Sequence, residues 1–117
     1  MTSAPQATSR VPTEHRRLVW SGPALDDLRA IRAHVSREHP SAAQRLATRL
    51  RLAVERLASH PESGRLVPEL TGSGYREVLV APYRVVYQVR ASDVVILRIW
   101  HGRRDVARFV SDRPTRY

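Results

Sequence analysis

The chain has 117 residues, which is enough for one hydrophobic core but too short for two independent ones, so we expect a single domain. It contains no cysteine, which excludes disulfide bridges, thiolate nucleophiles and zinc sites built on sulfur. Its 20 basic residues are all arginine and outnumber 11 acidic residues, and the resulting formal charge of +9 favours an acidic or polyanionic partner.

The N-terminal stretch, residues 1–13, is rich in Ser, Thr, Ala and Pro, and we expect it to be a disordered tail. It lacks the apolar core of a secretory signal, and no apolar run in the sequence is long enough to cross a membrane. We therefore expect a cytoplasmic protein without membrane contacts, with one folded domain at residues 14–110 and a second short tail at residues 111–117.

The first predicted strand is RRLVW, at residues 16–20, which runs into the turn-forming sequence SGP. Ser21 is placed to cap a following helix that has proline in its first turn, and Asp26 and Asp27 are expected to favour the positive end of the helix dipole. The helix ends before Pro40. Its apolar stripe has helical spacing and consists of Leu25, Leu28, Ile31 and Val35.

A second helix is predicted to begin at a cap formed by Ser41 and to end at the turn sequence HPESG. Only a few residues around His39 and Pro40 join the two helices, so we expect them to pack as an antiparallel hairpin. The buried face of the second helix is predicted to contain Ala43, Leu46, Leu50, Ala53, Val54 and Leu57.

Beyond Gly64 the apolar residues follow the spacing of strands, at residues 76–80, 83–90 and 94–100. The connections between these segments are short, which makes the strands antiparallel neighbours. The sequence therefore predicts an α+β fold: an N-terminal strand, then an antiparallel helix hairpin packed on a mainly antiparallel sheet of three to four strands, then a short C-terminal segment.

The middle strand has two chemically different faces, because successive side chains point to opposite sides of a sheet. One face is expected to pack on the helix hairpin, and it carries Tyr83, Val85, Tyr87 and Val89. The opposite face is expected to stay open to a partner, and it carries Arg84, Val86, Gln88 and Arg90.

Basic side chains gather on the predicted sheet and at its ends, where they are candidate contacts for a target or an inhibitor. The binding candidates are Arg65, Arg76, Arg84, Arg98, Arg103 and Arg104. A row of guanidinium groups on an open face suits phosphate oxygens. The alternative is a solvated face paired with Glu77, Asp93 and Asp105. A genome rich in arginine codons is another explanation for the absence of lysine, although it does not explain the net charge.

RNA cleavage without a metal requires a base for the 2′-hydroxyl, an acid for the leaving oxygen and positive charge on the phosphate. Glu77 and His101 are candidates for the proton carriers, and Arg84 and Arg104 for the phosphate clamps. The structural alternative makes Glu77 an edge-strand charge and His101 a surface residue. No metal or cofactor is expected, because no cluster of ligands has the spacing of a metal site.

Four pieces of the sequence, taken in order, resemble the RelE/ParE superfamily of bacterial type II toxins over residues 16 to 110. They are WSGPALDDLRAI, ERLASHPESGR, GYREVLVAPYRVVYQV and ILRIWHGRRD. The resemblance implies a small α+β toxin encoded beside an acidic antitoxin that wraps it and blocks its working face. It also implies that operator DNA is bound only through the complex with the antitoxin.

The superfamily divides by target. RelE-like members cut messenger RNA in the ribosomal A site, and Arg84 in YRVVY and Arg104 in HGRRD match their two arginines. Arg76 and Glu77 stand where that branch has sheet lysines, and Val110 lies near the position of its C-terminal tyrosine.

ParE-like members block DNA gyrase and need no catalytic residues. The long helix hairpin and the HGRRD ending resemble that branch, which we favour, with Arg103 and Arg104 as contacts. A plain basic RNA-binding domain is a third reading of the charge, and it leaves the order of the four pieces unexplained.

Overall fold

The computed structural model describes residues 15–102 and residue 105. Its elements, in chain order, are β1 (Arg17–Trp20), α2 (Gly22–Glu38), α3 (Pro40–Arg56), β2 (Arg65–Leu66), a short 3-10 helix η1 (Pro68–Leu70), β3 (Arg76–Val80), β4 (Tyr83–Val89) and β5 (Asp93–His101). The predicted tails and most of the predicted C-terminal segment lie outside the described residues. Within those residues, neither helix has the length and apolar character that a bilayer crossing requires.

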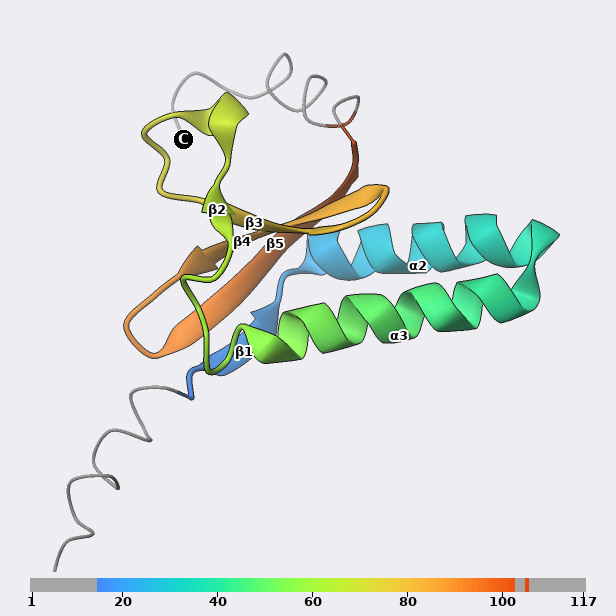
Figure 1. Ribbon diagram of the computed structural model, residues 1–117, viewed down its shortest axis with the longest axis horizontal. Coiled ribbons are helices and arrows are strands. Elements are labelled where there is room, and N and C mark those ends of the chain that lie inside the picture. Colours follow the sequence, from blue (N-terminus) through green and yellow to red (C-terminus); the bar gives the residue numbers. More distant parts are fainter. Residues whose placement is uncertain (1–14, 103–104, 106–117) are drawn as a thin grey trace, which may run out of the picture.

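The five strands form one mixed sheet in the order β1-β5-β4-β3-β2. β1 pairs with β5 in parallel, and the other neighbours are antiparallel. Figure 1 shows α2 and α3 side by side along one face of the sheet, with their connecting turn beyond the end of the sheet. The predicted α+β fold is confirmed, and the structure adds β2, whose two residues are too few to show a strand period.

The start of α2 is capped as predicted, because the Ser21 hydroxyl accepts a hydrogen bond from the Ala24 amide at 3.1 Å. The expectation for the helix dipole is wrong, since the first turn of α2 contains no acidic residue. Asp27 instead accepts from Arg98 Nε at 2.9 Å and Nη2 at 3.1 Å, and from the Ile99 amide at 2.9 Å. Asp27 thereby ties α2 to the part of β5 that continues past its pairing with β1.

The start of α3 differs from the prediction. The helix begins at Pro40, His39 occupies the cap position without a side-chain hydrogen bond, and Ser41 lies inside the first turn. The prediction that Ser41 caps this helix is therefore wrong. The physical reason is that proline suits the first helical position, where its missing N–H needs no partner and its fixed φ is already helical.

The main core lies between the helix hairpin and the sheet, and the predicted inward face of β4 is part of it. Most of the predicted second-helix stripe is in this core, since Ala53 is partly buried against it and Leu46, Leu50, Val54 and Leu57 are buried. Leu28, Ile31 and Val35 of α2 pack against it. The buried members of this core are Ala24, Leu46, Leu50, Val54, Leu57, Val80, Tyr83, Val85, Tyr87, Val94, Ile96 and Ile99.

A second, smaller core lies on the other face of the sheet, where Val67 and Leu70 pack against Val86 of β4 and Trp100 of β5. The segment that carries β2 and η1 covers this part of the sheet (Figure 1). The expectation of an open face is therefore only partly correct, because Arg84 and Val86 are both buried. This covering segment supplies the polar partners of the candidate site.

Candidate functional site

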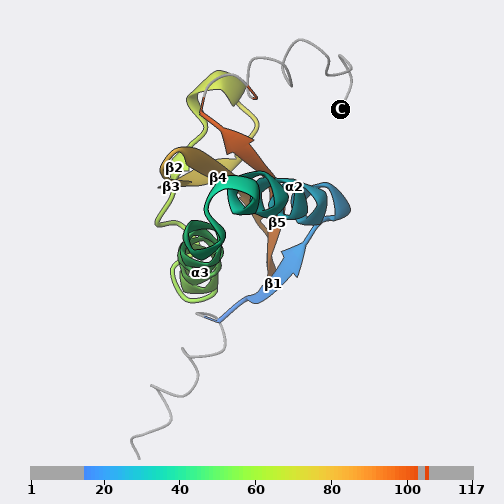
Figure 2. The same ribbon diagram turned by 90° about the vertical axis from the view of Figure 1, so that its right-hand side faces the viewer.

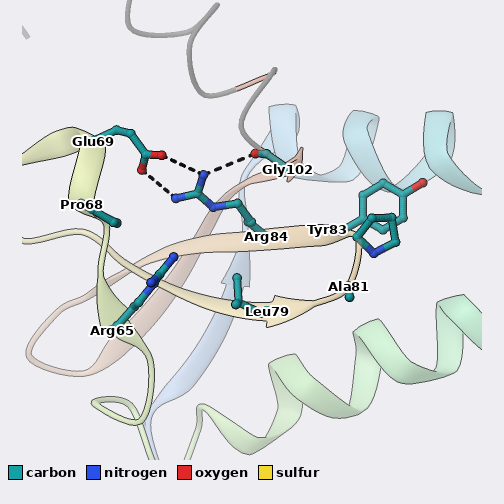
Figure 3. A pocket seen from close by; sticks show the side chains of 9 residues that line it. Arg65, Pro68, Glu69, Leu79, Ala81, Tyr83, Arg84 and Gly102 are labelled. Carbon is teal, nitrogen blue, oxygen red and sulfur yellow. Dashed lines mark hydrogen bonds and ion pairs between the residues drawn. The ribbon is translucent and has the colours of Figure 1, made fainter.

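Arg84 is the second residue of β4, next to the β3–β4 turn, and 6% of its surface is exposed. Its Nε donates to Glu77 Oε1 at 2.7 Å, and Nη2 donates to Glu69 Oε1 at 2.7 Å. Nη1 donates to Glu69 Oε2 at 3.1 Å and to the Gly102 carbonyl at 3.3 Å, as Figure 3 shows. The hydrogen bonds to Glu69 raise the pKa of Arg84 although burial opposes them, so the guanidinium stays charged and bound inside the protein.

Glu77 lies beside Arg84 on β3, and its side chain is fully buried. Its second oxygen accepts from Arg65 Nε at 2.6 Å, so both carboxylate oxygens are bound by arginines. Arg65, Glu77, Arg84 and Glu69 thus form a continuous chain of ion pairs, which we call the arginine–glutamate chain. Its exposed end is Arg65, whose side chain is 58% exposed.

Of the remaining predicted binding residues, the structure describes Arg76 and Arg98, and both bind partners within the protein. Arg76 donates to the Gly64 carbonyl at 2.8 Å, and Arg98 pairs with Asp27. The hydrogen bond to Asp27 raises the pKa of Arg98. Arg103 and Arg104 lie outside the described residues.

His101 ends β5 and is separated from the arginine–glutamate chain by the sheet. It is paired across the strands with Tyr83, whereas Arg84 is paired with Trp100. Residues directly opposite each other share a face, so His101 belongs with Tyr83 of the main core and Arg84 with Trp100 of the second core. The His101 and Tyr83 rings meet edge to face with centroids 5.3 Å apart. The structure brings Glu77 and Arg84 together and does not bring His101 to them.

A groove of about 490 Å³ lies beside the arginine–glutamate chain, at the end of the β3–β4 hairpin. Leu79, 60% exposed, and the exposed Arg65 side chain offer it an apolar surface and a positive charge. Such a groove can hold an apolar side chain next to a carboxylate. Its lining, most of which Figure 3 labels, consists of Arg65, Pro68, Glu69, Leu79, Ala81, Pro82, Tyr83, Arg84 and Gly102.

The roles of two acidic residues, Glu69 and Asp27, as partners of arginines were not predicted from the sequence. Glu69 lies on η1 and binds a residue 15 positions away, and Asp27 binds a residue 71 positions away. A signal was available for Asp27, because a carboxylate beside the apolar stripe of α2 must find a partner when it is partly buried. No comparable pattern marks Glu69. Within residues 15–102 and 105, no three His, Asp or Glu side chains group as metal ligands would.

The sequence matches known toxins. Residues 18–106 match the family model of the ParE toxin of the type II toxin–antitoxin system parDE. Toxin RelE2 of Caulobacter vibrioides is 44% identical over 87 residues, which cover 74% of this chain and 96% of that protein. The protein Y4kP of Sinorhizobium fredii is 37% identical over 89 residues, covering 74% of this chain and 88% of that protein.

Solved structures share the fold. The chromosomal ParDE system of P. aeruginosa contains a chain that superposes with a TM-score of 0.65 at 25% identity, covering 76% of this chain and 98% of that chain. The toxin–antitoxin complex RelBE2 of Mycobacterium tuberculosis contains one with a TM-score of 0.53 at 20% identity, covering 74% of this chain and 91% of that chain. With the family match over most of the chain, these similarities identify it as a type II toxin of the RelE/ParE superfamily, belonging to the ParE toxin family.

Proposed function

We propose that this toxin is ParE-like in action: it arrests growth by binding DNA gyrase, and a cognate acidic antitoxin neutralises it. The observation that carries the proposal is the burial of Arg84 in the arginine–glutamate chain. The residue that matches a nuclease arginine has its donors bound to Glu69, Glu77 and Gly102. A phosphate group would have to displace these partners.

The placement of the proton carriers also favours a binding toxin over a nuclease. Metal-free RNA cleavage requires a base, an acid and positive charge that converge on one phosphate. Glu77 has both oxygens bound by arginines, and His101 belongs to the opposite face of the sheet. The described residues therefore offer no converged acid–base pair, whereas a gyrase inhibitor requires none.

The second candidate is a ribosome-dependent messenger RNA endoribonuclease of the RelE-like kind. The observation in its favour is the 44% identity to a protein named Toxin RelE2. Arg104, its second phosphate clamp, lies outside the described residues. Membership of a toxin family leaves the third reading, a plain basic RNA-binding domain, without support.

An antitoxin partner is supported by the two structural neighbours, both of which are toxin–antitoxin systems. The charge of +9 favours an acidic partner, and the groove beside Arg65 suits a segment with alternating apolar and acidic side chains. We extend the proposal to regulation, in which the complex binds operator DNA through the antitoxin.

The deciding experiment is induction of the chain alone in a bacterial host, with growth, the DNA-damage response and messenger RNA integrity followed together. Arrest with a damage response and whole transcripts is the expected result, accompanied in vitro by loss of gyrase supercoiling and accumulation of cleaved plasmid. Transcripts cut within codons, with supercoiling unaffected, would replace the proposal by the nuclease reading. The same gene with an early stop codon controls for the burden of expression.

A further inference from the structure

One face of α3 carries three exposed arginines and one exposed leucine that the proposed function does not use. Arg45, Arg49, Leu52 and Arg56 are all exposed, and we call them the α3 ridge. Their spacing of four, three and four residues places them on one side of a helix with 3.6 residues per turn. The ridge is about 16 Å long, at a rise of about 1.5 Å per residue.

The guanidinium groups of the α3 ridge are not neutralised by neighbouring carboxylates. The guanidinium groups of Arg45 and Arg56 have no hydrogen-bond or ion-pair partner among the described residues, and that of Arg49 makes one long bond of 3.5 Å to the Ala81 carbonyl. The nearest carboxylate in sequence, Glu55, is paired with Arg51 on another side of the helix. The ridge therefore keeps three positive charges that face solvent.

The ion pairs found among the described residues include no member of the ridge. The arginines that form these pairs are Arg17, Arg29, Arg51, Arg65, Arg84 and Arg98. The excess positive charge of the molecule is thus concentrated partly along α3, which forms one flank of the protein (Figure 2).

We infer that the α3 ridge is a binding surface for the phosphate backbone of duplex DNA. The ridge lies on the exposed side of α3, and its three guanidinium groups stand in a row along one helix. A row of arginines on a straight helix suits a regular row of phosphates, and such contacts bind without reading sequence. A single strand is a poorer fit, because the ridge has no aromatic side chain on which unpaired bases could stack.

This contact does not depend on the identity of the toxin's target, and it goes beyond the expectation that operator DNA is reached only through the antitoxin. A ridge that holds DNA directly would raise the local concentration of the toxin on DNA, whether a topoisomerase or an antitoxin complex occupies that DNA.

The test measures binding of the full chain to a labelled mixed-sequence duplex of about 20 bp, at several salt concentrations between about 50 and 200 mM. The double variant Arg45→Gln with Arg56→Gln removes two charges from the ridge. It should bind about tenfold more weakly, and the slope of log K against log salt should become shallower by about 1.8, at about 0.9 per lost phosphate contact.

The matched control is Arg32→Gln with Arg37→Gln, which removes two exposed arginines of α2 that form no ion pair among the described residues and leaves the same net charge as the ridge variant. Its salt slope should match that of the unchanged chain, and circular dichroism should show both double variants folded. An equal loss in the control would overturn the inference, since net charge alone would then explain binding. No binding at low salt would also overturn it.

Two further arms separate DNA from other acidic partners. Leu52→Gln should leave the salt slope unchanged, because it removes no charge from the ridge. Duplex binding that is lost on Leu52→Gln and kept in the arginine variants would overturn the inference, because the charges of the ridge would then not hold the phosphates. Equal affinity for single-stranded DNA, duplex RNA or poly-glutamate would show a general polyanion surface and would contradict the assignment to duplex DNA.

Discussion

Arg84 is the residue whose expected role changes most between sequence and structure. Its position on a strand face suggested a phosphate clamp, but Glu69 and Glu77 hold it inside the protein. Glu69 reaches it from a three-residue turn that has no periodic signal of its own. A free arginine and a buried, paired arginine are identical in sequence, and only the fold distinguishes them.

Among the glycines, Gly64 is the one at which a side chain would meet close neighbours. A Cβ atom there would stand 2.5 Å from the Glu77 carbonyl oxygen and 2.5 Å from the Tyr87 hydroxyl. The same hydroxyl accepts from the Gly64 amide at 2.9 Å and donates to the Pro61 carbonyl at 2.8 Å. The Gly64→Ala variant should therefore lose about 1–3 kcal/mol of unfolding free energy, measured by urea denaturation.

The control for this prediction is Gly22→Ala, because a Cβ atom at Gly22 meets nothing within 4 Å. Its unfolding free energy should stay within about 0.5 kcal/mol of the unchanged chain. Equal unfolding free energies for the two alanine variants would contradict the prediction. They would mean that the turn at Gly64 shifts without cost and that its close contact with Tyr87 does not contribute to stability.

At the scale of elements, the arginine–glutamate chain adds side-chain links to the backbone pairing of β2, β3 and β4, and it also ties η1 to β4. The Arg84→Ala variant leaves Glu77 buried with Arg65 as its sole partner in this chain, and it should lose about 3–5 kcal/mol of unfolding free energy. The double variant Arg84→Met with Glu77→Leu should lose less unfolding free energy than the sum of the losses in the single variants Arg84→Met and Glu77→Leu. The reason is that the double variant leaves no unpaired charge in the interior.

Chemical denaturation of the single and double variants measures this coupling, and the exposed pair Arg51–Glu55 supplies the comparison. Its side chains are 59% and 53% exposed, so solvent screens them, and Arg51→Gln should change the unfolding free energy by less than about 0.5 kcal/mol. Simple additivity at Arg84 and Glu77 would mean that the two groups act independently, contrary to their 2.7 Å contact.

At the scale of the whole molecule, the formal charge of +9 makes the folded state repel itself. Salt screens this repulsion over a Debye length that falls from about 30 Å at 0.01 M to about 8 Å at 0.15 M. The melting temperature of the isolated chain should therefore rise by a few degrees over that range of NaCl concentration. In the variant Arg32→Gln with Arg37→Gln the rise should be smaller, and a fall on adding salt would show that surface ion pairs outweigh the repulsion.

The regular elements were predictable because each has a local signal. The two helices show apolar residues at helical spacing, and β3 was predicted at its observed bounds of Arg76–Val80. β2 was not predictable, since two residues carry no period. The helix start at Pro40 was misplaced because Ser41 is a good cap residue by type, and the preference of proline for the first helical position decided otherwise.

The sequence by itself determined the fold class, the hairpin on a sheet, the inward face of β4 and the toxin superfamily, because periodicity and motif order are properties of neighbouring residues. Tertiary structure alone decided which charges are available. It buried Arg84 and Glu77 together, separated them from His101 by the sheet and left the arginines of α3 in solvent. The physical reason is that ion pairing depends on distances across strands and turns, and the partners here lie 7 to 71 positions apart in the chain.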